Sequence, residues 1–218
     1  MRELDYVHFT VLLDPVRRLA AATAVIVDGA RLLDLDRADD WHLDPRMPSA
    51  EQTGEEVSAR NDLDRGHLVR RRDPVWGDPA TARLANEATF VFTGPVFDPA
   101  DPPYSGIRIP RLFWKIAAWI TAGVSSGPEL SAAGFVLDQS AQLADIDLES
   151  TRADVADPPP LGGFTTFEVP VADIQQLTGL TLDALVAADR YQPSPVSDGQ
   201  GGMRAIWRQL AQLSDIQL

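Results

Sequence analysis

The chain of 218 residues has the length of one globular domain, and its average charge argues against a polyanionic partner. Hydrophobic residues make up 44% and charged residues 23% of the sequence, which excludes a disordered tail or a fibre. The net charge of -13 comes from 32 acidic against 19 basic residues, and an acidic surface repels phosphates. No apolar run reaches the roughly 18 residues of a membrane span, so no membrane partner is expected.

The amino-acid composition excludes several kinds of functional site. The absence of Cys excludes disulfides, thiol nucleophiles and Cys-ligated metals. The three His residues, His8, His42 and His67, match no HExxH-type metal pattern. The N-terminus lacks the basic and apolar regions of a signal peptide, so we expect either a cytoplasmic protein or a secreted one given without its leader.

Hydrophobic patterning in the first half of the chain predicts strands separated by loops. Alternation over 6–12 predicts a strand, and an Asp14-Pro15 turn leads to a continuously apolar strand over 20–27, so that the two form a hairpin. The acidic stretch 34–56, broken by prolines, predicts a surface loop. A short helix is predicted over 81–87, and a strand over 88–93 that ends at Gly94-Pro95.

The second half of the chain predicts further strands, with helices added late. Strands are expected over 107–109, 113–120, 133–137 and 164–169, and short helices over 171–177 and 181–188. An acidic Pro- and Gly-rich loop is expected over 145–163. A last amphipathic helix is predicted to carry Met203, Ile206, Trp207, Leu210 and Leu213. The predicted fold class is α+β, a single domain over 1–218 with a mostly antiparallel central sheet and flanking helices.

One segment, 60–73, concentrates positive charge in this acidic chain. It holds five of the 18 Arg residues within thirteen positions and contains Asp64-Arg65-Gly66-His67. A neutral imidazole can take a proton from water while neighbouring guanidinium groups hold a phosphodiester. The structural alternative makes Asp64 and Arg65 a surface ion pair, Gly66 a bulge and His67 a half-buried core residue.

The segment belongs to a longer series of landmarks that resembles a known family. Together they resemble the DNA/RNA non-specific endonucleases of the ββα-metal, or His-Me finger, class, most strongly over 4–140. The landmarks are Leu4-Asp5-Tyr6, His8-Phe9, Asp28-Gly29, Trp41, Asp44-Pro45-Arg46, the run from Asp64 to Arg71, Trp76-Gly77, Ala85-Asn86, Ala88-Thr89-Phe90, the run from Val91 to Phe97, Ile109-Pro110 and Phe113-Trp114-Lys115.

The resemblance implies a mechanism and assigns residues to it. It implies a Mg²⁺-dependent, sequence-non-specific nuclease acting on DNA and RNA, with His67 as the general base, Arg65 at the active site and Asp64 orienting its neighbours. Arg60, Arg70 and Arg71 are the candidates for phosphate contacts. Arg72 is a weaker one, because pairing with Asp73 explains it equally well. A second copy of the chain, forming a homodimer, is a further candidate partner.

The chain departs from the family pattern between Phe90 and Val91. The resemblance implies a segment at this place that supplies an Asn ligand to Mg²⁺ and a Glu, but here Ala88-Thr89-Phe90 runs directly into the next strand. The only two Asn residues, Asn61 and Asn86, are not at the ligand position, so the metal ligands stay unknown. Three explanations are open: a deletion that disables the enzyme, an omitted segment, or a metal site rebuilt from Asp62, Asp64, Asp73 and Glu87.

Three functional hypotheses follow. The first is a Mg²⁺-dependent endonuclease that cleaves DNA and RNA. The second is a degenerate, catalytically weak nuclease domain that binds nucleic acid or a protein partner without cleaving it. The third is a domain whose Arg cluster only balances nearby acidic residues.

Overall fold

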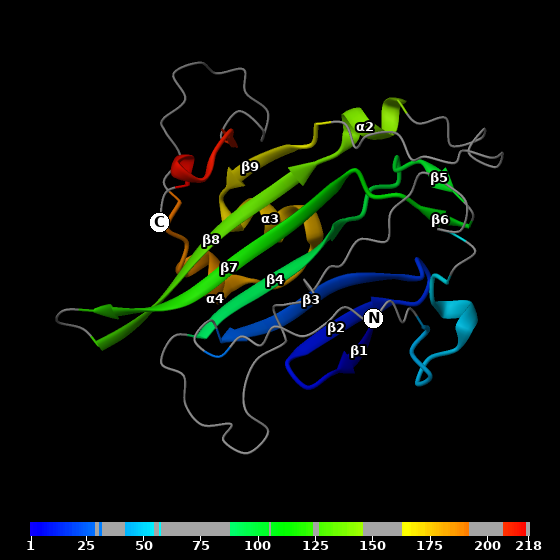
Figure 1. Cartoon of the computed structure of the whole chain (residues 1–218), viewed down its shortest axis with the longest axis horizontal. Coiled ribbons are helices and arrows are strands. Elements are labelled where there is room, and N and C mark those ends of the chain that lie inside the picture. Colours follow the sequence, from blue (N-terminus) through cyan, green and yellow to red (C-terminus); the bar gives the residue numbers. More distant parts are fainter. Residues whose placement is uncertain are drawn as a thin grey trace.

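An eight-stranded antiparallel sheet is the frame of the molecule (Figure 1). The computed structural model describes residues 1–28, 31, 42–54, 57, 88–104, 106–123, 127–145, 163–191 and 207–216. The strand order is β1-β2-β3-β4-β7-β8-β9-β10. The bounds are β1 Arg2–Asp5, β2 Phe9–Asp14, β3 Leu19–Asp28, β4 Ala88–Val96, β7 Leu112–Gly123, β8 Gly127–Asp138, β9 Thr165–Val169 and β10 Arg208–Leu210.

The predicted strand over 6–12 is wrong in its first part. Residues 2–5 already form β1, and the chain then turns, with the Tyr6 amide donating to the Phe9 carbonyl at 2.8 Å. Val7 lies at this turn and is 90% exposed. The alternating pattern thus spans a turn between two strands, whereas the hairpin of β2 and β3 is confirmed by their antiparallel pairing.

The predicted break at Gly94-Pro95 is also wrong, because β4 continues through both residues to Val96. Pairing with β3 ends at Thr93, while pairing with β7 continues through Val96. Pro95 therefore lies where β4 has only one described neighbour, and a residue without an N–H is tolerated there. At Gly94 an added Cβ would lie 2.3 Å from the Ala21 carbonyl oxygen and 2.9 Å from Trp114 Nε1, so the glycine permits close packing.

The longest strands, β7 and β8, carry the core. Side chains at even positions of β7 and β8 point to one face, where α3 (Val171–Thr178) and α4 (Asp183–Ala187) pack (Figure 1). Ile116, Val136, Val169 and Ile174 are fully buried in this cluster. Both helices lie close to their predicted positions, and both strands are longer than predicted. The α+β class with a mostly antiparallel sheet is confirmed.

The smaller elements lie at the ends of the sheet. They are η2 (Ser49–Glu51), the two-stranded hairpin of β5 (Pro103–Tyr104) and β6 (Ile107–Arg108), α2 (Ser140–Asp145) and η5 (Leu213–Asp215). The predicted helix over 81–87 and most of the loop over 145–163 lie outside the described residues. No helix in the described part of the chain is long and apolar enough to cross a membrane.

The predicted C-terminal amphipathic helix is wrong over its described part. Residues 208–210 form β10 at the edge of the sheet, and Arg208 pairs directly with Glu168 of β9. Glu168 is fully buried, and the two side chains form an ion pair. Trp207 packs against Phe167, with ring centroids 5.7 Å apart. A strand puts Arg208 directly opposite the buried carboxylate, which needs a cationic partner.

Candidate active site

The residues predicted to carry the chemistry all lie outside the described part of the chain. These residues are Arg60, Asp64, Arg65, His67, Arg70, Arg71 and Arg72, together with Asn61, Asn86 and the alternative acidic ligands Asp62, Asp73 and Glu87.

The described residues define where this segment leaves and rejoins the fold. Val57, just before it, is buried with 6% exposure. Ala88, just after it, starts β4 and pairs with Asp28 at the end of β3. Asp28 is 2% exposed and forms an ion pair with Arg31, with 2.5 Å between the carboxylate and Nε. The segment 58–87 thus returns to the sheet at the carboxyl end of β3.

A connection that we call the strap, residues 42–54, leads toward the segment and lies along the first hairpin. It is attached to β1 by an ion pair between Arg2 and Glu51 at 2.9 Å, and Arg46 donates to the Asp5 carbonyl at 2.9 Å. Its far end reaches the β2–β3 turn, where the Thr53 hydroxyl donates to the Arg18 carbonyl at 2.7 Å. The strap is therefore held at both ends of the β1–β2–β3 unit.

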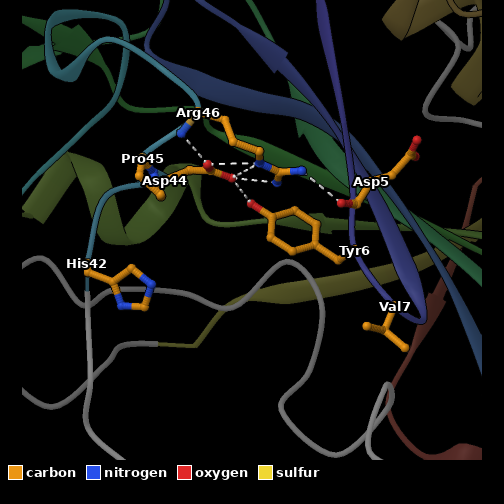
Figure 2. Close-up of a pocket in the computed structure, with 7 residues that line it drawn as sticks. All are labelled: Asp5, Tyr6, Val7, His42, Asp44, Pro45 and Arg46. Atoms are coloured by element: carbon orange, nitrogen blue, oxygen red, sulfur yellow. Dashed lines mark hydrogen bonds and ion pairs between the residues drawn. The ribbon is translucent and has the colours of Figure 1, made fainter.

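Three side chains fix the first end of the strap: Tyr6, Asp44 and Arg46 (Figure 2). The Tyr6 hydroxyl donates to Asp44 Oδ2 at 2.6 Å, and Arg46 Nη2 donates to the same oxygen at 2.6 Å. The Arg46 guanidinium lies 4.7 Å from the centre of the Tyr6 ring, and Phe9 stacks on Tyr6 at 4.4 Å. An open cavity of about 610 Å³ lies beside these residues and is also lined by His42 and Val7.

These contacts perturb the titration of all three groups. Hydrogen bonds from Arg46, and then from Tyr6, hold the pKa of Asp44 well below its ordinary value. The hydrogen bond to Asp44 raises the pKa of Arg46. Burial, and then the hydrogen bond to Asp44, raises the pKa of Tyr6. At neutral pH Asp44 and Arg46 are therefore a fixed ion pair, with Tyr6 as a neutral donor.

Gln52 is a structural residue that the sequence analysis missed. It is 8% exposed, and its side-chain amide donates to the carbonyls of Asp44 at 2.9 Å and Met47 at 3.1 Å. Its Oε1 accepts from the Asp44 amide at 2.8 Å. The buried amide closes the strap into a compact loop. The sequence gives no signal for this role, because Gln52 is one of four polar residues between Pro48 and Gly54.

The described residues do not fit a Mg²⁺ site. Mg²⁺ prefers oxygen ligands in octahedral geometry, and no group of three or more His, Cys, Asp or Glu residues in the described part of the chain could hold a metal ion. Both Asn residues fall within 58–87, outside the description. Mg²⁺ binding stays a prediction.

Replacing Asp44 with asparagine is expected to lower stability at neutral pH, because Arg46 and Tyr6 lose their charged acceptor. The pKa of Asp44 is lower in the folded than in the unfolded chain, so its contribution is fully present above the unfolded value of 3.8. It is lost as the pH falls from there through the folded pKa. Urea unfolding should show a lower midpoint for Asp44→Asn at pH 7, and the difference should shrink below about pH 4.

Glu3→Gln is the matched control, since Glu3 lies exposed on the neighbouring β1. It should leave the midpoint unchanged at both pH values. A difference between Asp44→Asn and wild type that persists undiminished at pH 2 would contradict the ionic role of Asp44.

The fold and the sequence together define the class of the protein. It is an α+β protein built on one antiparallel sheet, with a basic, His-containing segment in the connection from β3 to β4. The sequence profile of the DNA/RNA non-specific endonucleases matches residues 1–93 and 80–189. The chain belongs to the DNA/RNA non-specific endonuclease family.

A relative and a solved structure are also similar to this chain. An uncharacterized protein of Sinorhizobium fredii (strain NBRC 101917 / NGR234), y4fB, is 34% identical over 241 residues, covering 86% of this chain and 34% of that protein. The chain thus spans about a third of the length of this relative. The crystal structure of the EndoG/EndoGI complex, which concerns the inhibition of EndoG, contains a chain with a TM-score of 0.52 at 13% identity. That match covers 84% of this chain and 88% of the other.

The comparisons also bear on the expected missing segment. The family profile matches in two pieces that overlap at residues 80–93, a stretch that contains the Phe90–Val91 junction. The alignment with the S. fredii protein extends over 241 residues, more than the 218 of this chain, so the relative has residues without a counterpart here. Phe90 and Val91 are consecutive residues of β4, each paired with both β3 and β7.

Proposed function

We propose that the chain is a sequence-non-specific endonuclease that hydrolyses phosphodiester bonds of DNA and RNA. One observation carries the proposal: the tetrapeptide Asp64-Arg65-Gly66-His67 lies inside the first matched segment of a nuclease family. The proposal takes residues 1–218 as a single nuclease domain. The expected Mg²⁺ is part of it and remains to be tested.

The proposed chemistry begins at His67. The neutral imidazole accepts a proton from a water molecule, and the resulting hydroxide attacks the phosphorus of the scissile bond. The bond between phosphorus and the leaving oxygen breaks, and that oxygen takes a proton from a second water molecule. Arg65 hydrogen-bonds the phosphate oxygens, so that its guanidinium neutralises charge that grows as the new bond forms. Asp64 orients its neighbours, and Arg60, Arg70 and Arg71 hold adjacent phosphates.

The local cluster of arginines can bind phosphate although the net charge of the protein is negative. A net charge of -13 describes the average surface, and it weakens long-range attraction to a polynucleotide. At contact distance the five Arg residues between 60 and 72 offer planar, bidentate donors, and such pairs depend little on the distant charges. We therefore expect substrate to be held at close range.

A second function is supported by the interrupted family match. If the family segment expected between Phe90 and Val91 is missing from the protein, the chain is a nuclease domain that binds nucleic acid or a protein partner and cleaves weakly or not at all. The two matched pieces and the longer aligned relative favour this alternative.

A cleavage assay and a binding assay on the same preparation distinguish the two functions. Supercoiled plasmid and a structured RNA are incubated with the purified chain and Mg²⁺, Mn²⁺ or Ca²⁺, with chelator as control. Cation-dependent nicking of both substrates supports the endonuclease. Salt-sensitive binding without cleavage under any cation supports the binding domain, and neither binding nor cleavage would contradict both.

A further inference from the structure

Four arginines lie at the end of the sheet where β3 begins. Arg17 and Arg18 belong to the β2–β3 turn, and Arg108 and Arg111 belong to the connection from β4 to β7, which contains the β5–β6 hairpin (Figure 1). We call these four residues the end patch. They are separate in the sequence from the arginines of the 60–73 segment.

Two contacts join the β2–β3 turn to the β4–β7 connection. The Arg17 guanidinium lies 4.6 Å from the centre of the Phe97 ring, and Phe97 directly follows β4. Arg18 reaches the β5–β6 turn, where a Cβ added at Gly106 would lie 3.8 Å from Arg18 Nη1. Arg108 follows Gly106 on β6. Guanidinium groups from two parts of the chain therefore lie on one surface.

The acids that pair with the end patch are buried, whereas its arginines are exposed. The Asp14 side chain is 11% exposed and that of its partner Arg17 is 52% exposed, with 2.6 Å between Oδ2 and Nη1. The Asp101 side chain is 1% exposed and that of Arg111 is 38% exposed, with 3.9 Å between Oδ1 and Nη1. An anion that approaches from solvent therefore meets guanidinium groups before it meets these carboxylates.

The other two arginines of the patch are held by neutral groups. Arg18 Nε donates to the Gln52 carbonyl at 2.8 Å, and Arg108 Nη1 donates to the Asp101 carbonyl at 2.6 Å. A carbonyl fixes the position of a guanidinium group but does not neutralise its charge. These contacts thus orient two positive charges at the surface.

Two further acids lie at this end of the sheet. Asp98 is exposed and Asp138 is half-buried, and each accepts a hydrogen bond from a main-chain amide of its own loop. Two accessible carboxylates thus stand against four arginines. In the whole chain, by contrast, acidic residues outnumber basic ones by 32 to 19, so the end patch is a local exception to the acidic surface.

The backbone at Arg18 is unusual for an arginine. Its φ of 60° lies in the left-handed region, and Arg18 is the one non-glycine residue in the described part of the chain with a positive φ. Glycine and asparagine adopt this conformation at lower cost. The backbone preference of the turn therefore does not explain arginine at this position, whereas a role for its side chain does.

The end patch also adjoins the start of the segment that carries the nuclease motif. The Thr53 hydroxyl donates to the Arg18 carbonyl at 2.7 Å, which places this end of the strap on the patch. Val57, the last described residue before 58–87, follows a few positions later and is buried. A polynucleotide carries phosphates all along its length, so one that is bound near the motif can also reach a second basic surface.

We propose that the end patch is a second phosphate-binding surface, at which its four arginines contact the sugar–phosphate backbone of a nucleic acid beyond the scissile bond. Guanidinium groups spread over an exposed surface match a repeated anion better than a single small one, because each can pair with a different phosphate. Such contacts position a nucleic acid without reading its sequence. The proposal rests on the proposed function, since that function supplies nucleic acid as the partner.

Binding of a DNA duplex of about 30 base pairs to the full chain, measured in chelator at several salt concentrations, tests the patch. Arg17→Gln and Arg108→Gln are each expected to lower the slope of log K against log salt by about 0.9, and to weaken binding about eightfold at roughly 0.1 M salt. Arg190→Gln is the matched control. It removes the same charge from a side chain that is 41% exposed and pairs with the exposed Glu129, and it should change neither quantity.

Arg18→Asn is a further variant that suits the left-handed backbone, so it should keep the wild-type melting temperature and weaken binding as the other two variants do. Wild type that does not bind the duplex, or patch variants that bind like wild type, overturn the proposal. It is also overturned if the variants lose binding to vesicles of phosphatidylserine and phosphatidylcholine but keep binding to the duplex, which assigns the patch to a membrane surface.

Plasmid nicking with Mg²⁺, measured on the same proteins, separates this proposal from the proposed function. A chain that nicks plasmid but whose duplex binding does not depend on the patch retains the endonuclease function and loses the end patch. A chain that does not nick plasmid but whose duplex binding depends on Arg17 and Arg108 retains the end patch and loses the endonuclease function.

Discussion

Replacing His67 with alanine is expected to remove nearly all nucleic-acid cleavage. The imidazole is the proposed base for the attacking water, and general-base catalysis by a positioned side chain contributes roughly 10²–10⁴-fold to a rate. The initial rate of plasmid nicking by His67→Ala should fall by that factor. Binding of a short duplex should change little, because the Arg residues that hold phosphates remain.

His42→Ala is the matched control for this variant. His42 is exposed on the strap and lies outside the 60–73 segment, so its loss should leave the nicking rate unchanged. Both variants should show wild-type circular dichroism and melting temperature. Nicking by purified His67→Ala at the wild-type rate would contradict the mechanism.

Gly94→Ala is expected to be the most destabilising single change described here. Its new Cβ would lie 2.3 Å from the Ala21 carbonyl oxygen and 2.9 Å from Trp114 Nε1, so the backbone of β3 and the buried indole would both have to move. Overpacking of this kind costs about 3 kcal/mol when backbone must shift. For a protein of this size that corresponds to a fall in melting temperature of roughly 6–12 °C.

Gly163→Ala is the corresponding control, since an added Cβ there meets no atom within 4 Å. It should leave the urea midpoint close to wild type. If Gly94→Ala is as stable as Gly163→Ala, the close approach of β3, β4 and Trp114 at position 94 is wrong.

Much of the sheet could be predicted from hydrophobic patterning alone. Mainly apolar runs such as 20–27 and 113–120 form strands in the interior of the sheet, with a neighbouring strand on each side. The errors lie where local signals and tertiary pairing disagree. Gly94-Pro95 is a reliable turn signal in isolation. Here no described strand pairs with one side of β4 at these residues, and a large indole needs the space that glycine leaves.

The C-terminal error has a different cause. Residues 207, 210 and 213 repeat every three positions, a spacing typical of a helix that can also arise by chance in a short strand followed by a turn. The deciding interaction is the buried Glu168, 40 positions earlier, whose carboxylate pairs with Arg208. A prediction from neighbouring residues alone cannot detect a partner that lies 40 positions away in the sequence.

At the candidate site too, the sequence predicts the motif but not the contacts between distant segments. The Asp64-Arg65-Gly66-His67 motif gives the family from the sequence, and the family profile confirms that assignment. The Asp44-Pro45-Arg46 landmark marked an important stretch, but only the structure shows that it binds Tyr6 and that Gln52 closes the loop. These are contacts between separate segments, so their partners cannot be read from spacing.

The way the strap is attached has a consequence for how the protein opens. Its two ends are held by hydrogen bonds and ion pairs at the surface, and Met47 and Gln52 are the described strap residues that are buried. Segments with little buried apolar area separate from a fold at a free energy below that of global unfolding. The strap is therefore expected to separate from the sheet at a lower free energy than global unfolding, and it precedes the motif at 64–67 along the chain. Substitutions at Tyr6 or Arg46 are therefore expected to change the fraction of molecules in which the strap is attached. They would do so without changing the residues of the motif.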